Sequence, residues 1–458
     1  GNDLGRDSVP SLVLKLAIPS MIAQFVTVLY SIIDRMFIGN IPKIGDAALA
    51  GVGVCGPIVT LLTSFGTLIG LGGSILMTMR MGAGRKKQAE SILAHSFALL
   101  VVFSAVLTVL FLVSKRYLLN WFGASPATFP YADSYLTIYT AGTFFALLAI
   151  GLNYFITCQG FPAIGMITVL IGAVTNIILD PVLIFGYFGM PRMGIAGAAV
   201  ATVFGQIVAA SMALWFNLKF NKELDISMKG FHPNGHLIGQ IYKVGAPSIV
   251  VQAIGSLMTY GMNLILAAFG SAQTVFGIYF KLQSFVFMPV FGLNNGMVPI
   301  IAYNYGARHK DRVIRTIKHS VAYGVGIMCV GLIVMHIFPA QLMRMFDAEE
   351  SLIAIGVPAL ETISLSFVFA GFCIVVGSVF QALGNGVYSM IVSVARQMCV
   401  LLPVAKLLSL SGEVTLIWWA FPIAELASLL LSTYFLVRIY KKIICHIGEP
   451  VTTREITE

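Results

Sequence analysis

The chain has 458 residues, of which 58% are hydrophobic and only 10% charged, and its mean hydropathy is +0.91. This proportion of apolar side chains excludes an ordinary soluble domain. The net charge of +9 would suit a nucleic-acid binder, but its distribution along the chain favours a membrane protein with no nucleic-acid partner. The six cysteines form no CxxC pair, so we expect no disulfide framework, metal site or cofactor.

The apolar residues fall into twelve continuous segments, most of them close to the ~20 residues that cross a bilayer. The segments are 12–38, 48–79, 91–114, 131–158, 163–188, 194–217, 240–268, 273–302, 314–338, 352–382, 387–410 and 413–438. Continuous runs exclude an outer-membrane barrel, whose strands alternate. We expect an all-α polytopic membrane protein. Its predicted parts are a six-helix bundle over 1–217, a basic cytoplasmic linker over 218–239, a second six-helix bundle over 240–445 and a cytoplasmic tail over 446–458.

Lysine and arginine gather in alternate loops. Nineteen of the 28 basic residues lie near the two ends and in every second loop, seven lie on the opposite set, and Lys281 and Arg396 lie inside apolar segments. Because cytoplasmic loops are enriched in basic residues, this bias predicts that both termini are cytoplasmic. An even number of spans also requires the termini to share a side, so the two predictions agree.

The sequence also repeats itself. Lys15–Ser20 resembles Lys243–Ser248, and Met81–Lys86 resembles Tyr305–Lys310, at offsets of 228 and 224 residues. Six helices per half is an even number, so the two halves have the same orientation in the membrane. Such parallel repeats are typical of transporters whose substrate site lies between the halves.

In the first half, Asp34 and Asp180 are acids that interrupt long apolar runs. A carboxylate at membrane depth is expensive and by default marks an ion or proton pathway. Asp34 lies nineteen residues after Lys15, and Asp180 lies eighteen residues after Pro162. Both helices are expected to run outward, so at ~1.5 Å per residue the two acids reach a similar depth.

Two further polar residues are expected near these acids. Asn176 precedes Asp180 by four residues and shares its helix face, and Thr202 lies in the outer half of the next helix. A proton site needs a carboxylate in a low dielectric or beside a second carboxylate, and a cation site needs several oxygens. The residues leave proton and sodium open. As alternatives, Asp34 is an interfacial acid beside Arg35, or Asp180 caps a helix broken at the following proline.

Four charged residues of the second half lie far from the ends of its apolar segments. Lys281 and Arg396 have no acid nearby in the sequence, and Glu361 and Glu425 are candidate partners for them. Structural pairing or a water-filled cavity is as consistent with Lys281 and Arg396 as a direct role in function.

Several local motifs together resemble the MATE (multidrug and toxic compound extrusion) family over essentially the whole chain, and in particular its DinF-like branch with the MepA-like exporters. The motifs are Asp34–Gly39 after Pro19, Asn176–Pro181, Gly194–Thr202, Tyr303–Ala307 and Phe380–Gly384. The resemblance implies a V-shaped pair of six-helix bundles in a bacterial cytoplasmic membrane. It also implies export of small cationic amphipathic drugs or dyes by antiport.

In the DinF-like branch the coupling site lies in the N-terminal half. The resemblance maps it onto Asp34, Asn176, Asp180 and Thr202, with Asn153 as a fifth member, and maps a helix bend onto Pro19. The segments that would carry a C-terminal sodium site in the NorM-like branch contain no acid here. We therefore expect proton coupling, with sodium as the alternative, and a monomer.

The drug cavity is expected to use adaptable apolar side chains. The candidates are Met36, Phe37, Met258, Met262, Phe287, Met288 and Phe291. A lipid-linked precursor flippase of the same superfamily is the main rival, although buried carboxylates disfavour an anionic headgroup. A membrane enzyme is a distant alternative, because the seven histidines form no HExxH-like cluster.

Overall fold

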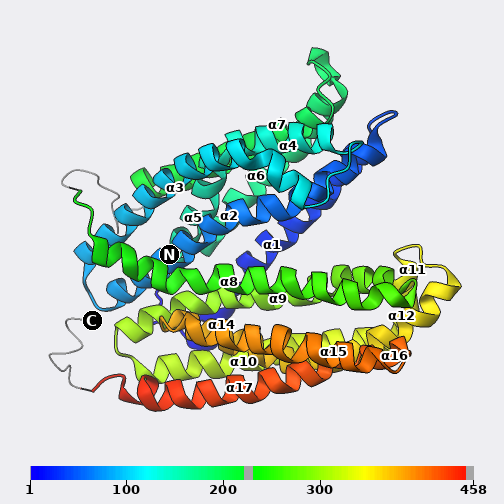
Figure 1. The fold of residues 1–458 in the computed structure, drawn as a ribbon. Helices are drawn as coiled ribbons and strands as arrows, with labels where there is room; N and C mark the ends of the chain where they lie inside the picture. Colours follow the sequence, from blue (N-terminus) through cyan, green and yellow to red (C-terminus); the bar gives the residue numbers. More distant parts are fainter. Residues whose placement is uncertain (1, 221–230, 450–458) are drawn as a thin grey trace. The chain divides into compact units, whose positions relative to one another are not determined.

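The computed structural model describes residues 2–220 and 231–449, and in these ranges every regular element is a helix (Figure 1). Parts of the predicted linker (221–230) and tail (450–458) lie outside the described residues. The α-helices are α1 Val9–Gly39, α2 Gly45–Gly82, α3 Lys86–Trp121, α4 Phe129–Ala141, α5 Thr143–Cys158, α6 Pro162–Phe185, α7 Ile195–Trp215, α8 Gly235–Leu266, α9 Ala272–Gly306, α10 Lys310–Ile337, α11 Pro339–Arg344, α12 Glu350–Ile363, α13 Phe367–Ala382, α14 Gly386–Val394, α15 Leu402–Ser409, α16 Val414–Ile417 and α17 Ala420–Lys442. The short 3₁₀ or π turns are η1 Tyr187–Gly189, η2 Phe216–Phe220, η3 Ala267–Phe269, η4 Ser364–Ser366, η5 Ala395–Leu401 and η6 Ile444–His446.

These helices form a multi-pass membrane protein. Eleven helical stretches in the described ranges are long and apolar enough to cross a membrane, and α4 with α5, bent by 60° at their junction, make a twelfth. The apolar segments predicted from hydropathy are therefore confirmed as helical, eleven of them as spans by length and composition and the twelfth if the bent pair is one span.

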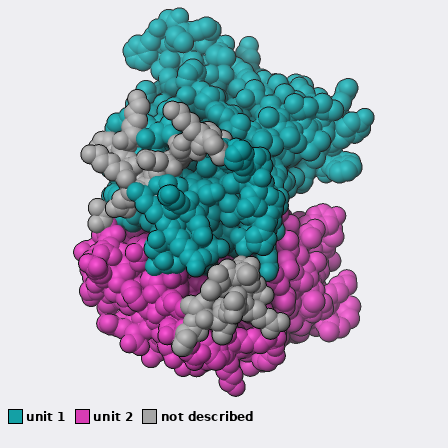
Figure 2. Space-filling view, turned by 90° about the vertical axis from the view of Figure 1, so that its left-hand side faces the viewer, with its two compact units in different colours: residues 1, 22–246 teal, residues 2–21, 247–458 magenta. Residues whose placement is uncertain are grey.

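Packing divides the chain into two compact units (Figure 2). Unit 1 contains Ile22–Ala246, and unit 2 contains Asn2–Met21 together with Pro247–Glu458. The boundaries fall inside α1 and α8, beside Pro19 and at Pro247. Each unit therefore includes the first turns of the helix that continues in the other unit.

Matching glycines accommodate these first turns within each unit. In unit 1 a Cβ on Gly72 of α2 would overlap the carbonyl oxygen of Ile241 in α8. In unit 2 a Cβ on Gly296 of α9 would lie 2.6 Å from the backbone nitrogen of Ala17 in α1. Small residues allow membrane helices to approach this closely. Gly72 and Gly296 are 224 residues apart, which is the offset of the sequence repeat, so the duplication is also visible in the packing.

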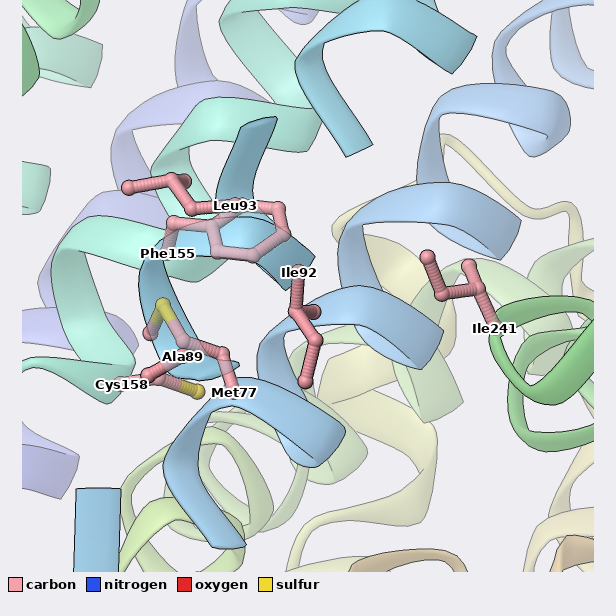
Figure 3. Close-up of a cluster of buried hydrophobic side chains, with 7 residues drawn as sticks. All are labelled: Met77, Ala89, Ile92, Leu93, Phe155, Cys158 and Ile241. Carbon is pink, nitrogen blue, oxygen red and sulfur yellow. The ribbon is translucent and has the colours of Figure 1, made fainter. Parts of the chain in front are cut away.

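A buried cluster fixes the start of α8 in unit 1. Its side chains come from α2, α3, α5 and α8 and are fully or almost fully buried (Figure 3). The members are Met77, Ala89, Ile92, Leu93, Phe155, Cys158 and Ile241. Dense packing of this kind gives unit 1 a rigid frame on which the polar residues described next are held.

Candidate functional site

Close glycine contacts bring α6 and α7 together around the predicted polar residues. A Cβ on Gly205 would lie 2.7 Å from the Gly172 carbonyl oxygen, and a Cβ on Gly197 would lie 2.5 Å from the Leu183 carbonyl oxygen. Asn176 lies between these two contacts along α6. The alternation of glycine and alanine in α7 therefore sets the helix separation that lets polar side chains from both helices meet.

Asn176 and Thr202 meet at this crossing. The Asn176 side-chain nitrogen donates to Thr202 Oγ1 at 3.4 Å, and Thr202 Oγ1 donates to the Ala198 carbonyl at 3.0 Å. Both side chains are buried. Thr202 thereby orients the Asn176 amide, whose oxygen receives no hydrogen bond from the described residues.

The two predicted acids lie together. Asp34 on α1 is 7% exposed and Asp180 on α6 is 0% exposed, and their carboxyl groups are within hydrogen-bonding reach of each other. In the described part of the chain no N–H or O–H donates to Asp34 Oδ1 or to either carboxyl oxygen of Asp180. Buried carboxylates are normally satisfied by donors or cations, so this pair is short of positive charge or protons.

Tyrosines that the sequence analysis did not single out complete the polar cluster. The Tyr30 hydroxyl lies near both acids, and the Tyr135 hydroxyl lies near Thr202. The rings of Tyr135 and Tyr139 stack at 6.2 Å, and Gln206 Nε2 donates to the Tyr139 hydroxyl at 3.0 Å. The helical spacing in the sequence could have indicated two of these residues. Tyr30 precedes Asp34 by four residues and Gln206 follows Thr202 by four, so each pair shares a helix face.

The structure does not bring Asn153 to the acids. Its side-chain nitrogen donates to the Gly165 carbonyl at 3.1 Å and links α5 to α6. Gly165 precedes Asn176 by eleven residues, which is roughly 16 Å along α6. Pro19 lies inside α1, and its predicted role as a bend remains a prediction.

The predicted cavity residues lie in different environments. Met36 and Phe291 are exposed, and Phe37 packs on Phe185 with ring centroids 6.4 Å apart. The remaining candidates are buried in this structure: Met258, Met262, Phe287 and Met288. None of these seven carries the polar chemistry of the site.

Two of the four charged residues of the second half form an ion pair. Arg396 Nη1 lies 2.7 Å from Glu425 Oε1 in unit 2. Lys281 instead lies over the Phe346 ring at 5.7 Å from its centroid. Glu361 makes no ion pair with the described residues. The predicted polar network is thus reduced to Arg396, Glu425 and their neighbours.

Comparison with curated proteins finds relatives that match almost end to end. A Staphylococcus haemolyticus protein named multidrug export protein MepA is 27% identical over 430 residues, covering 94% of this chain and 93% of its own length. The protein of the same name from Staphylococcus aureus strain N315 is 26% identical over 424 residues, covering 92% of each.

Solved structures share the fold. A structure described as the outward-facing conformation of a multidrug resistance MATE family transporter of the MOP superfamily gives a TM-score of 0.88 at 22% identity, covering 98% of both chains. A structure described as MATE in the bent conformation also gives 0.88 at 22% identity, covering 96% of this chain and 98% of its own. The family model MatE matches residues 19–182 and 247–407. Because this match takes in both halves and most of the chain, the protein belongs to the MatE family, as its sequence motifs predict.

Proposed function

We propose that this protein is a secondary active exporter in a bacterial cytoplasmic membrane. It carries cationic amphipathic compounds out of the cell in exchange for protons bound at Asp34 and Asp180. Family membership and the multidrug export relatives at 26–27% identity support the export of such compounds. The basic loops support cytoplasmic termini. We infer that a monomer suffices, since both halves of the transport unit lie in one chain.

One observation carries the coupling proposal: two buried carboxyl groups lie close together, and Asp34 Oδ1 and both Asp180 carboxyl oxygens receive no hydrogen bond from the described residues. Two neighbouring carboxyl groups can hydrogen-bond each other only if one of them holds a proton. Without that proton the cluster carries charge that burial makes costly, and a cationic substrate or a second proton relieves the cost. Proton and cationic drug therefore compete for the same negative charge, which is the requirement for antiport.

Sodium is the alternative coupling ion. Sodium binds carboxylate, amide and carbonyl oxygens. Among the described residues, no donor reaches Asn176 Oδ1, Asp34 Oδ1 or either carboxyl oxygen of Asp180. Pro181 lies inside α6 and has no N–H, so the Ile177 carbonyl lacks its helical donor and adds a further candidate oxygen.

The test is efflux of a fluorescent cationic dye from proteoliposomes under an imposed pH gradient or an imposed sodium gradient. We expect the pH gradient alone to drive efflux by the wild type and Asp180→Asn to abolish it. If only the sodium gradient drives efflux, the coupling ion bound by the same oxygens is sodium and not the proton.

Asp133→Asn is the matched control. Asp133 is also a carboxylate of unit 1, but it is one-third exposed and is paired with Lys115 Nζ at 3.0 Å. This variant should retain proton-driven efflux. If neither gradient moves dye in the wild type, the exporter proposal is wrong and lipid-linked precursors become the substrates to test.

A further inference from the structure

Unit 2 contains an ion pair deep within its apolar helices. Arg396 lies on η5, at the end of α14, and Glu425 lies on α17; these neighbouring elements are orange and red in Figure 1. Arg396 follows the start of α14 by ten residues and Glu425 follows the start of α16 by eleven, so each lies roughly 15 Å from a helix end. That depth is near the middle of a hydrocarbon core about 30 Å thick.

The pair is incompletely satisfied. Glu425 is 7% exposed, its Oε1 is 2.7 Å from Arg396 Nη1, and its Oε2 receives no hydrogen bond from the described residues. A structural ion pair at this depth usually saturates both oxygens, because an unpaired buried acceptor is costly. Glu425 thus holds Arg396 by one oxygen only, although a guanidinium and a carboxylate can form two parallel hydrogen bonds.

Arg396 retains donors that face away from Glu425. In the amide orientation that satisfies both ends of Gln397, its Oε1 accepts from Arg396 Nη2 and its Nε2 donates to the Ile254 carbonyl at 3.2 Å. The Arg396 side chain is still 33% exposed. An arginine at membrane depth almost always faces the protein interior or a water-filled cavity rather than lipid. Its exposed part is therefore available to a ligand.

The groups around Glu425 can accommodate a neutral carboxyl group. Tyr279 from α9 and Cys373 from α13 lie near the Glu425 carboxylate. Ser428 and Ser432 lie one and two turns further along α17, next to Cys373. Arg396 is the cation that faces Glu425 among the described residues. Hydroxyl and thiol groups can hydrogen-bond a protonated carboxyl group without introducing a new charge.

The backbone at Arg396 is irregular. The seven residues Ala395–Leu401 form a π-helix, followed by Pro403 in the next turn. Single π-helical turns are rare and occur frequently at functional sites. The same region of the first half is α6, which carries Asp180 before the equivalent Pro181, at an offset of 222 residues. The duplicated helix carries a charged residue of opposite sign in the two halves, at different positions: Asp180 corresponds to Leu402, and Arg396 corresponds to Val174.

We propose that Arg396 is a binding site for the carboxylate of substrates that carry one, such as zwitterionic amphiphiles, and that this carboxylate replaces Glu425 on the guanidinium. When it is displaced, Glu425 takes one proton from water and becomes neutral, so the number of charges in the site is conserved. This inference rests on the proposed exporter function and assigns to it a site for the carboxylate group of a substrate. The single-oxygen contact, the exposed guanidinium and the unpartnered Oε2 are the features that permit the exchange.

The test uses two dyes that differ only at the carboxyl group: tetramethylrhodamine, which is zwitterionic, and its methyl ester, which is a cation. Binding of each dye to the purified full chain is measured by fluorescence anisotropy from about pH 6 to about pH 8, where the free acid stays ionised. The readout is the ratio of the two affinities. In the wild type we expect the ratio to shift toward the free acid as the pH falls, because binding the carboxylate takes up a proton.

Two variants separate the roles of the pair. Glu425→Gln mimics the protonated glutamate side chain. At the higher pH it should therefore raise the affinity for the free-acid dye relative to the ester by about tenfold, and it should remove the pH dependence of the affinity ratio. The double variant Arg396→Gln with Glu425→Gln keeps the site neutral, avoids a lone buried charge, and should lose that tenfold preference.

The outcomes distinguish the two proposals. An affinity ratio that is the same in the wild type and both variants would overturn the carboxylate site while leaving the exporter proposal intact. Binding of the ester without binding of the free acid in any of the three proteins would also overturn it alone. If the wild type binds neither dye, the exporter proposal and this inference both fail.

Discussion

Replacing Gly205 by alanine tests whether the α6–α7 contact holds the coupling site together. The added Cβ would lie 2.7 Å from the Gly172 carbonyl oxygen and 3.3 Å from Asn176 Cβ. Relief of this overlap requires the helices to separate by about half an ångström, at a cost of about 1–3 kcal/mol. The bond from Asn176 to Thr202 is already 3.4 Å long, so the same movement breaks it.

We expect Gly205→Ala to lower the melting temperature of the purified protein and to reduce dye efflux at a fixed pH gradient. Gly53→Ala is the matched control, because a Cβ on Gly53 meets nothing within 4 Å. It should leave stability unchanged or slightly increased, since alanine favours the helix. If the two variants melt alike and both transport like the wild type, the glycine contact does not position the site.

Two further predictions concern hydrogen bonds within single units. Tyr139→Phe removes the acceptor of the Gln206 amide and should destabilise the protein by about 1–2 kcal/mol in thermal melting. Adding Gln206→Leu removes the unpaired donor and should recover most of that loss. A double variant that is as unstable as Tyr139→Phe, or less stable, would contradict the reasoning. Asn304→Ala removes the buried amide that donates to the Leu4 carbonyl at 2.9 Å. Trypsin should therefore cut after Arg6 sooner than in the wild type. Unchanged cleavage would show that this hydrogen bond does not hold the N-terminal residues in place.

Hydropathy was sufficient to predict the membrane spans because each crosses the bilayer as a continuous apolar helix. It could not predict how a span is shaped. The segment predicted over 131–158 is two helices that meet at Gly142, where a Cβ would lie 2.8 Å from the Val203 side chain of α7. The neighbouring Val203 belongs to another helix, so the sequence of the segment alone does not show this close approach.

The candidate site was predictable as far as charge and helix face determine it. Asp34 and Asp180 are conspicuous in apolar segments, and Asn176 follows from its four-residue spacing to Asp180. Tyr135 was not predicted, because a tyrosine in an apolar helix is read as core or interface until its hydroxyl is seen near a polar group. Asn153 was mapped onto the site by family resemblance alone, and the structure instead places its amide at the Gly165 carbonyl, eleven residues along α6 from Asn176.

The duplicated halves keep the backbone plan and change the charges on it. In unit 1 two carboxyl groups face each other, so the site gains or loses charge with each proton. In unit 2 the ion pair of Arg396 and Glu425 is neutral overall, so it responds when a ligand brings its own charge. If both proposals hold, coupling and selectivity are separable: Asp180→Asn stops proton-driven export of every substrate, whereas Glu425→Gln changes only the preference between substrates with and without a carboxylate. Loss of proton coupling in Glu425→Gln would instead mean that the two sites share one function.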